Sequence, residues 1–356
     1  MHVVICGAGV VAACTAYFLA RRGAAVTVVE RCRVACAASG KAGGFLALDW
    51  CAGTKLDRLA RRSFALHAEL ARELGRDWGY RRLTTYYGTV GRGGRGLSWT
   101  SPGVAIVGRI GDPDTTAQVH PALFTQAILD AARAHGASLR IARVTGTLGD
   151  NLARGVATDV GPIEADAVVF AMGPWSAATG LPPVFADKGH SLVFATGTDI
   201  PDEALFLEMR DGAEVLTPEV FPRPDGTTYV SAISRRVQVP ADPTMVGPDP
   251  GAFDRLEALC ERLSPALRRE RIVARQACAR PSTHDGLPLI GAVPGRAGAF
   301  VATGHSVWGI LNAPATGEAM AELILDGVSR SVDLAAFDPA RAPTDCVRPA
   351  TEEADR

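Results

Sequence analysis

The first 30 residues constrain the fold more strongly than any other part of the chain. A short β-branched run at residues 3–6 is followed by a glycine-rich turn and then by a helical pattern over residues 10–22. A second strand pattern covers residues 26–29 and ends at Glu30. We therefore predict a β–α–β unit at the start of the chain, with Gly23 ending its helix.

The turn inside this unit has the spacing of a dinucleotide-binding site, G-x-G-x-x-G/A, with Gly7, Gly9 and Ala12 at its fixed positions. The first glycine allows a tight turn, the second lets backbone N–H groups approach a diphosphate, and the alanine keeps the helix near the sheet. The helix N-terminus adds partial positive charge. Glu30 can accept a hydrogen bond from a ribose 2′-hydroxyl and disfavours the 2′-phosphate of NADP. The unit thus predicts an adenine dinucleotide ligand.

Composition limits the function classes. The 356 residues correspond to about two domains, and 47% apolar with 21% charged residues is typical of a globular protein. The 37 Lys and Arg residues against 38 Asp and Glu residues leave a net charge of −1, so we expect no nucleic-acid partner. No uncharged apolar run reaches about 18 residues, and we expect no membrane span.

The eight cysteines stand mostly in apolar runs of a large chain, and we expect them to be reduced thiols. The seven histidines are scattered singly and no zinc-type cysteine spacing occurs, so we expect no metal site. The first strand pattern starts without a charged segment before it. We therefore expect no secretory signal and a cytoplasmic location.

Beyond the first unit, helical and β-rich segments alternate. Residues 38–45 are too rich in glycine and small residues for a helix; they predict a loop pressed against a flat or anionic group, or else a flexible surface loop. Helix patterns cover residues 54–74, 121–135, 250–263 and 314–326, the last started by Asn312. Strand patterns cover residues 84–87, 104–107, 166–171 and 299–303, and residues 184–280 are strand-rich.

Several motifs, in order along the chain, resemble the D-amino-acid oxidase superfamily, the flavoenzymes that include glycine oxidase and sarcosine oxidase. Besides the amino-terminal unit, they are SGKAGG at 39–44, ADAVV at 165–169, GPWS at 173–176, RPSTHDG at 280–286 and GHSVWG at 304–309. The resemblance covers nearly the whole chain. The segments SGKAGGFLA and NAPATG are similar to a less characterised branch of FAD-dependent oxidoreductases.

Pattern and resemblance together predict an α/β fold, in which an FAD-binding Rossmann-like domain is interleaved with a β-rich (α+β) substrate domain. The FAD-binding domain would be discontinuous, over residues 1–83, 118–180 and 283–335. The substrate domain would comprise residues 84–117 and 181–282. Residues 336–356 would form a C-terminal tail that frays beyond Pro343.

The resemblance implies FAD as the cofactor. Glu30 would hold the adenosine ribose, the 39–44 loop would run past the flavin ring, and Gly173 and Trp175 would lie near the dinucleotide. The 304–309 stretch and the helix after it would face the pyrimidine edge of the flavin, where a helix N-terminus stabilises negative charge. The candidate cofactor-binding residues are Gly7, Gly9, Val10, Val11, Glu30, Arg31, Ser39, Gly40, Lys41, Gly43, Gly44, Gly173, Trp175, Gly304, His305, Ser306, Trp308, Gly309 and Ile310.

Three residues are candidates for the chemistry. Arg280 falls where glycine oxidase resembles this chain and places the arginine that binds the substrate carboxylate, as a guanidinium can do bidentately; alternatively it is a structural arginine paired with a nearby acid. Tyr229 is the best tyrosine candidate for substrate recognition, or else a core residue. Cys278 falls where sarcosine oxidase carries its flavin on a cysteine, but a buried cysteine can also be a small apolar side chain.

The resemblance implies an FAD-dependent oxidoreductase that oxidises the C–N bond of a small amino acid or secondary amine by hydride transfer to flavin. Sarcosine-type oxidases use a lysine over the flavin, where this chain has Thr228 or Tyr229. Lys188 is the only lysine between residues 56 and 356, so the acceptor, oxygen or another, stays open. The alternatives are a non-catalytic FAD-binding or assembly protein, and an NAD-dependent dehydrogenase suggested by the first unit alone.

Overall fold

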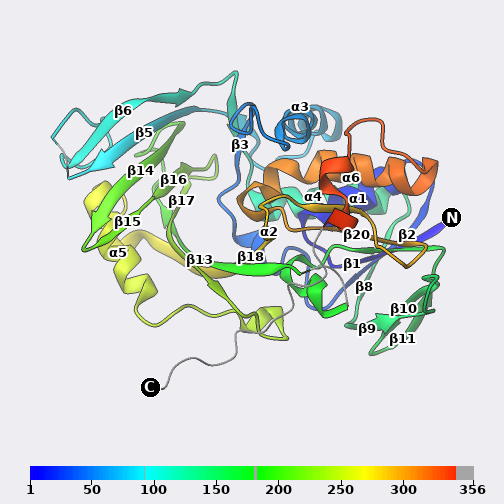
Figure 1. The fold of residues 1–356 in the computed structure, drawn as a ribbon. Coiled ribbons are helices and arrows are strands. Elements are labelled where there is room, and N and C mark those ends of the chain that lie inside the picture. The colour runs from blue at the N-terminus through cyan, green and yellow to red at the C-terminus, as the bar shows by residue number, and fades with distance from the viewer. Residues whose placement is uncertain (92, 180–182, 342–356) are drawn as a thin grey trace.

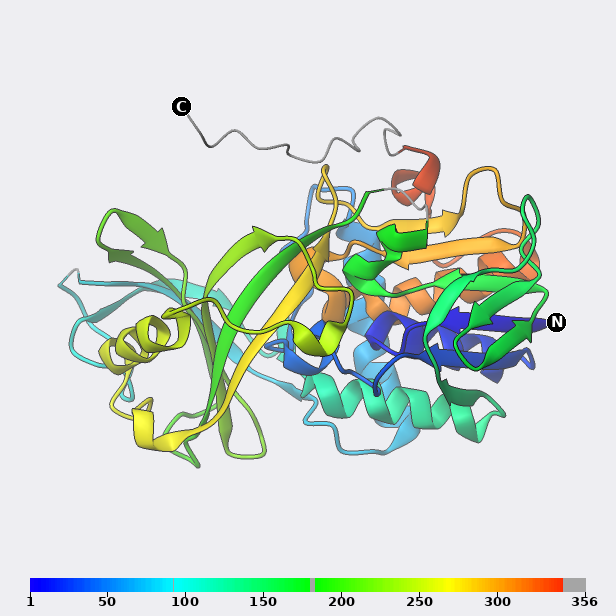
Figure 2. The same ribbon diagram turned by 90° about the horizontal axis from the view of Figure 1, so that it is seen from below.

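The computed structural model describes residues 1–91, 93–179 and 183–341, with the side chains of 177–179 left aside. It contains two units side by side, one built on a mostly parallel sheet covered by helices and the other rich in β-strands (Figure 1). The chain passes between them several times, and the long strands β13 (Phe185–Ala195) and β18 (Ile272–Ser282) run from the β-rich unit toward the parallel sheet (Figure 2).

The parallel sheet has the strand order β19-β20-β12-β1-β2-β8. All neighbours in it run parallel except β19, which is antiparallel to β20. Strands that are buried on both faces are apolar along their whole length, as the first and second runs of the sequence indicated. The strands are β1 (His2–Cys6), β2 (Ala25–Glu30), β8 (Ser138–Ile141), β12 (Ala167–Phe170), β19 (Leu289–Ala292) and β20 (Ala299–Thr303).

Different elements cover the two faces of this sheet. Val3 and Ile5 of β1 point into a core shared with the helices, while Val4 and Cys6 point into a second core. That second core is closed by a three-stranded antiparallel sheet. The helices are α1 (Val10–Arg21), α3 (Asp57–Leu74), α4 (Pro121–Ala134) and α6 (Gly309–Asp326), and the small sheet is β9 (Val144–Thr147), β10 (Gly155–Thr158) and β11 (Gly161–Glu164).

The β-rich unit is built on a sheet with the order β18-β13-β17-β16-β14-β5-β6, with β15 beside β14. Leu192 and Phe194 of β13 pack with α5 (Ala252–Leu263) on one face. Val193 points to the other face, which is turned toward the parallel-sheet unit. The remaining strands are β5 (Thr84–Val90), β6 (Val104–Gly111), β14 (Glu203–Asp211), β15 (Glu214–Leu216), β16 (Glu219–Pro222) and β17 (Thr227–Val237).

A fourth, small sheet lies where the chain passes from one unit to the other. Its order is β3-β7-β4, from strands β3 (Phe45–Ala47), β7 (Thr116–Gln118) and β4 (Arg81–Arg82). Among the described residues, no helix is both long and apolar enough to span a membrane. The α/β fold class predicted from the sequence is confirmed, with a Rossmann-like sheet beside a β-rich unit.

The carboxyl-terminal helix begins earlier than the sequence indicated. It starts at Gly309, so Asn312 is not its first residue, and Pro314 lies inside it. Proline has no N–H for the carbonyl of residue 310. Instead, buried His67 of α3 lies with Nε2 3.0 Å from that carbonyl and 3.2 Å from the carbonyl of Leu311. Because both partners only accept, Nε2 carries the proton, and burial lowers the pKa of His67 to about 4.

Residues 38–41 also differ from the prediction, because they form one helical turn, α2 (Ala38–Lys41), rather than a loop. A Cβ at Gly40 would lie 2.1 Å from the carbonyl oxygen of Ala35, so glycine permits this turn to pack closely on the preceding chain. The carboxyl-terminal tail is described up to residue 341, and Phe337 within it is buried in the core. The expected fraying beyond Pro343 lies outside the described residues.

Two cysteines correct the expectation that all are reduced thiols. Cys32 and Cys36 form a disulfide in the loop between β2 and α2, at a sequence separation of 4. The backbone of Ala35 is left-handed, with φ 54°, and this turn brings the chain back toward Cys32. Cysteine spacing alone did not reveal this turn. Five other cysteines are buried free thiols, namely Cys6, Cys14, Cys51, Cys260 and Cys278, and Cys346 lies outside the described residues.

Candidate active site

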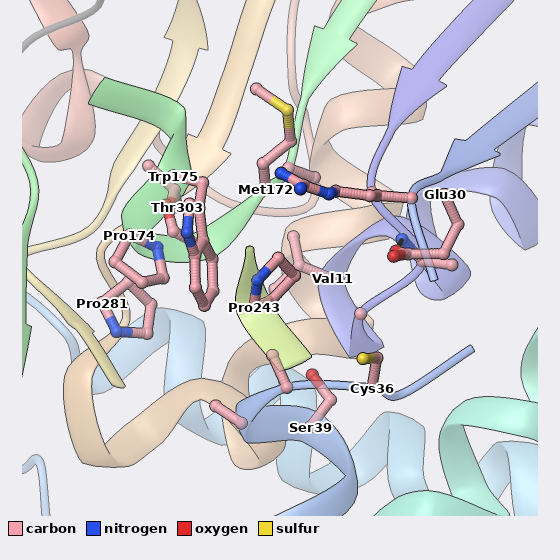
Figure 3. A pocket seen from close by; sticks show the side chains of 18 of the residues that line it. Val11, Glu30, Cys36, Ser39, Met172, Pro174, Trp175, Pro243, Pro281 and Thr303 are labelled. Atoms are coloured by element: carbon pink, nitrogen blue, oxygen red, sulfur yellow. Dashed lines mark hydrogen bonds between the residues drawn. The ribbon is translucent and has the colours of Figure 1, made fainter. Parts of the chain in front are cut away.

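A cavity of about 670 Å³ runs along the carboxyl ends of β1, β2, β12 and β20. This edge is where open α/β sheets bind ligands, since the loops that leave the strands diverge there. Glu30 lies at one end of the cavity and Trp175 and Pro281 at the other, with Val11 and Pro243 between them (Figure 3). The cavity is therefore elongated and bordered by both units.

The turn after β1 is rigidly built. Gly7 has φ +98°, and a Cβ there would lie 2.7 Å from the carbonyl oxygen of Ala171. The carboxylate of Glu30 accepts hydrogen bonds from the N–H of Ala8 at 2.7 Å and from the N–H of Cys32 at 2.9 Å. The N–H of Val10 donates to Ser39 Oγ at 2.9 Å. These contacts fix the start of α1 at the border of the cavity.

The start of α6 lies at another part of the same cavity. The chain arrives through Ser306, which has a left-handed backbone with φ 50°, uncommon for a residue other than glycine. Among the described residues, no side chain caps the N-terminus of α6 at Trp308. The first-turn N–H groups of a helix need partners, so this end can receive an electron-rich group. His305 beside it is hydrogen-bonded to Thr316, and burial lowers its pKa to about 4.

Most predicted site residues border this cavity. These are Gly7, Gly9, Val10, Val11, Glu30, Arg31, Ser39, Gly173, Trp175, Arg280, His305, Ser306, Gly309 and Ile310. The others lie outside its lining, namely Gly40, Lys41, Gly43, Gly44, Tyr229, Cys278, Gly304 and Trp308. The roles assigned to both groups stay predictions.

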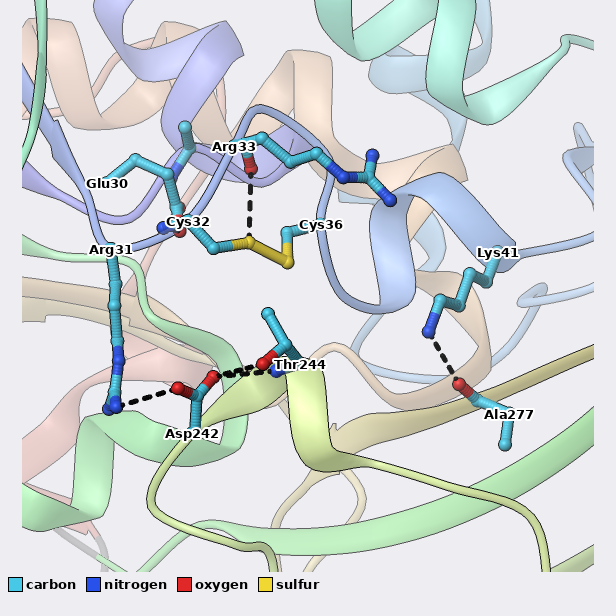
Figure 4. The surroundings of a disulfide bond; sticks show 10 residues. Glu30, Arg31, Cys32, Arg33, Cys36, Lys41, Asp242, Thr244 and Ala277 are labelled. Carbon is cyan, nitrogen blue, oxygen red and sulfur yellow. Dashed lines mark hydrogen bonds and ion pairs between the residues drawn. A yellow bond between two sulfur atoms is a disulfide. The ribbon is translucent and has the colours of Figure 1, made fainter.

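Several of the residues outside the lining have a packing role. A Cβ at Gly43 would lie 2.5 Å from the ring of Phe221, and one at Gly44 would lie 2.0 Å from the carbonyl of Val119. These two glycines therefore let the chain pass closely between the two units. Lys41 Nζ donates to the carbonyl of Ala277 at 2.9 Å (Figure 4), and burial raises the pKa of the neighbouring Cys278 thiol.

Among the cavity residues that sequence reasoning missed are two segments, residues 142–147 and the pair Ala241 and Pro243. Neither carries a motif, and each reaches the cavity only through the fold. The second segment follows β17 of the β-rich unit and is bound by two residues of the other unit. Trp175 Nε1 donates to the carbonyl of Pro240 at 2.8 Å, and Arg31 pairs with Asp242, close to the disulfide (Figure 4).

Arg280 is the one predicted substrate-binding side chain that reaches the cavity. In the described part of the chain it makes no ion pair, and its Nε is buried without a hydrogen-bond partner. Tyr229 instead stacks on Phe221, with ring centroids 6.0 Å apart, and is buried. Within the described ranges, no group of three or more His, Cys, Asp or Glu residues could hold a metal ion.

Known proteins are similar to this chain over most of its length. The family described as FAD dependent oxidoreductase, DAO, matches residues 2–323. A Schizosaccharomyces pombe protein named "Putative oxidoreductase C1F5.03c" is 30% identical, over 95% of this chain and 97% of that protein. The glycine oxidase of Geobacillus kaustophilus is 29% identical over 95% of this chain and 96% of its own length. The crystal structure of glycine oxidase from that organism has a TM-score of 0.81 at 26% identity, over 95% of this chain and 98% of the other.

Proposed function

Because the chain belongs to the DAO family of FAD dependent oxidoreductases, we propose that it oxidises the C–N bond of a small amino acid or secondary amine. The FAD cofactor and the oxidoreductase class follow from the family. The amino-acid substrate class is supported by relatives that are glycine oxidases and that match the chain over 95% of its length. The alternative of an NAD-dependent dehydrogenase rested on the first unit alone, whereas the family match extends to residue 323.

The residues present fit FAD. The start of α1 and the Gly7 turn suit the diphosphate, and the carboxylate of Glu30 suits the adenosine ribose. The uncapped start of α6 suits the edge of the flavin that becomes electron-rich on reduction. FAD, when bound, supplies the acceptor for the hydride that leaves the carbon next to the substrate nitrogen.

The unpaired guanidinium of Arg280 beside the cavity is the observation that supports an amino-acid substrate. A guanidinium at a cavity wall without an acidic partner has lost part of its hydration and gained no ion pair, which is costly unless a ligand provides an anion. A carboxylate matches the planar fork of the guanidinium. Arg280 would therefore hold the substrate carboxylate and orient the adjacent C–N bond toward the cofactor.

The test measures whether amino acids reduce the bound flavin in the absence of oxygen. Purified protein should carry the visible absorbance of flavin, and acid precipitation shows whether Cys278 retains it covalently. Glycine, N-methylglycine, proline and alanine are then added anaerobically, and bleaching by at least one is expected. Arg280→Met should raise the apparent KM for that compound roughly 10- to 100-fold, since a charge-assisted hydrogen bond is lost. Arg210→Met, an exposed arginine on β14, is the matched control.

Three other outcomes contradict the proposal. No bleaching with any amino acid or secondary amine rejects the substrate class. Flavin that binds firmly and resists every two-electron donor supports a non-catalytic role. Equal KM values for the Arg280 variant and the parent protein remove the assigned role of the guanidinium. The electron acceptor, oxygen or another, stays a prediction until reoxidation is measured.

A further inference from the structure

Strand register places several polar side chains on one face of the large sheet. Adjacent strands β18, β13, β17 and β16 bring Gln276 opposite Ser191, Ser191 opposite Ser231, and Ser231 opposite Glu219. Directly paired residues of antiparallel strands point to the same side. Arg280 lies on this side as well, since it is four residues after Gln276 on β18.

This face is the one turned toward the parallel-sheet unit. Phe221 and Tyr229 are paired on it next to Glu219, and both rings lie against Gly43 of the other unit. The face is therefore enclosed between the two units. The other residues of β16 are apolar, so Glu219 has no charged neighbour on its own strand.

The guanidinium of Arg280 extends along the face toward Glu219. A Cβ built on Gly189 would lie 3.9 Å from Cζ and Nη2 of Arg280, so the guanidinium lies over Gly189. On β13, Gly189 is two residues before Ser191 and points to the same side. The absence of a side chain at Gly189 leaves room for the guanidinium. Arg280 acts on the carboxylate of Glu219 electrostatically, yet the two do not form an ion pair. Two opposite charges therefore lie on one enclosed face without contacting each other. Arg280 borders the cavity, and Glu219 is not among the residues that line it.

Glu219 has no hydrogen-bond or ion-pair partner among the residues that the structure describes. Burial raises its pKa to about 7, and the positive charge of Arg280 opposes this rise. Tyr229 and Cys278 beside it are neutral at pH 7, because the pKa of Tyr229 is raised to about 12 and burial raises that of Cys278. Of the charged groups nearby, Asp187 lies opposite Arg280 but pairs with Arg236, and Lys41 lies near Cys278 and donates to the carbonyl of Ala277. An unpartnered carboxylate in such surroundings is unfavourable, as is an unpartnered guanidinium. A ligand that carries both charges would satisfy both groups at once.

We propose that Glu219 binds the positively charged amino nitrogen of a substrate whose carboxylate is bound by Arg280, and that it accepts the proton of that nitrogen. This inference rests on the proposed function and narrows its substrate class to zwitterionic amino acids with a primary or secondary amine. In the step, an N–H bond breaks and an O–H bond forms on Glu219, with no change in oxidation state. The nitrogen keeps its electron pair, which an amine needs before the neighbouring carbon can lose hydride.

A pKa near neutrality suits this role. A carboxylate with an ordinary pKa would be too weak a base for a substrate ammonium, and a fully protonated one could not bind a cation. Glu219 is ionised in part at pH 7 and would be ionised further once the cationic nitrogen is beside it. Hydroxy acids lack this nitrogen, and simple amines lack the carboxylate for Arg280, so both should bind poorly.

The test compares ligands with and without the nitrogen in the FAD-loaded protein. Binding of glycine, N-methylglycine, L-proline and acetate is measured from the change in flavin absorbance, or by competition where a ligand gives no change. Glu219→Gln should weaken amino-acid binding roughly 10- to 100-fold and leave acetate binding unchanged or tighter. Arg280→Met should weaken both. The limb of kcat/KM against pH near 7 should disappear in the Glu219 variant.

Control variants separate the possible failures. Glu164→Gln changes an exposed glutamate on β11 and should alter none of these values. Glu219→Asp keeps the charge on a shorter side chain and should give intermediate affinity; it also serves if the glutamine variant fails to retain FAD. Equal losses for amino acids and acetate, or no loss in either variant of Glu219, overturn the inference while the proposed function stands. If no probe affects the flavin of the parent protein, the proposed function itself fails.

Discussion

Arg31 Nη2 lies 3.1 Å from Asp242 Oδ2, and this ion pair joins the loop after β2 to the loop after β17 across the cavity. Arg31 also donates to the carbonyl of Ala241, at 2.5 Å. Because Ala241 and Pro243 border the cavity, the segment between them covers part of the proposed FAD site. The two units are thus connected directly over the region where the adenosine half of the cofactor is expected.

Removal of this ion pair should speed cofactor release. Both side chains are partly exposed, so Asp242→Asn should raise the dissociation rate of FAD only modestly, by roughly fivefold at most. The rate is measured by trapping released FAD with an excess of a second flavoprotein. Asp326→Asn, which breaks the Arg22–Asp326 pair far from the cavity, should leave the rate unchanged. Equal rates for both variants would show that the segment does not retain the cofactor.

Gly7→Ala should abolish FAD retention. Alanine would meet both an unfavourable φ of +98° and the carbonyl of Ala171 at 2.7 Å, which forces the turn away from the position proposed for the diphosphate. Gly23→Ala is a matched control, because its φ is +84° but no atom lies within 4 Å. The absorbance ratio of flavin to protein and the thermal midpoint should fall strongly in the first variant. In the second only the midpoint should fall.

His67 should make stability depend on pH in a defined direction. Its folded pKa of about 4 lies below the ordinary 6.5, so the unfolded chain binds the extra proton and stability falls as pH drops from 6.5 to 4. The slope is about 1.4 kcal/mol per pH unit, or about 3 kcal/mol over the window. In urea titrations, the unfolding free energy of the parent minus that of His67→Gln should decrease as pH falls from 6.5 to 4. Above pH 8 this difference should stay constant. A constant difference at every pH would contradict the assignment.

Glu219 should make stability depend on pH in the direction opposite to that of His67. Its folded pKa of about 7 lies above the ordinary 4.5, so the ligand-free protein loses stability as pH rises from 4.5 to 7. Glu219→Gln should therefore be more stable than the parent above pH 7, by up to about 3 kcal/mol, and nearly equal to it at pH 4.5. Thermal unfolding at the two pH values measures this. A variant that is less stable at pH 8 would indicate a structural role for the carboxylate.

Because Cys32 and Cys36 form a disulfide, the number of thiols that can be titrated is expected to be lower than the number of cysteines. The chain has eight cysteines, and the Cys32–Cys36 bond leaves five free thiols among the described residues. With Cys346, which lies outside them, five or six thiols are expected on titration in denaturant without reductant. The double variant Cys32→Ser, Cys36→Ser should lose about 2 kcal/mol of stability by the loop-entropy relation. It should also bind FAD more weakly, because the closed loop lies between Glu30 and Ser39. Eight titratable thiols in freshly purified protein would contradict the bond.

The local parts of the site could be predicted from sequence because they depend on neighbours in the chain. The strand, the Gly7 turn, the helix and Glu30 follow one another within 30 residues, and each has a short-range steric or electrostatic signature. The left-handed turn at Ala35 has no such signature, so the disulfide was not foreseen. The same holds for the start of α6, which His67 supports from another helix.

Sequence by itself determined the strand–turn–helix unit that suits an adenine dinucleotide, since glycine spacing and apolar runs act through the local backbone. Only the tertiary structure decided which side chains share the face proposed for the substrate. Arg280 and Glu219 are separated by 61 positions, and only the pairing of the four strands that carry and separate them puts both on one face. Strand register is set by packing and turns across the whole sheet, and these are physical constraints that no short segment contains.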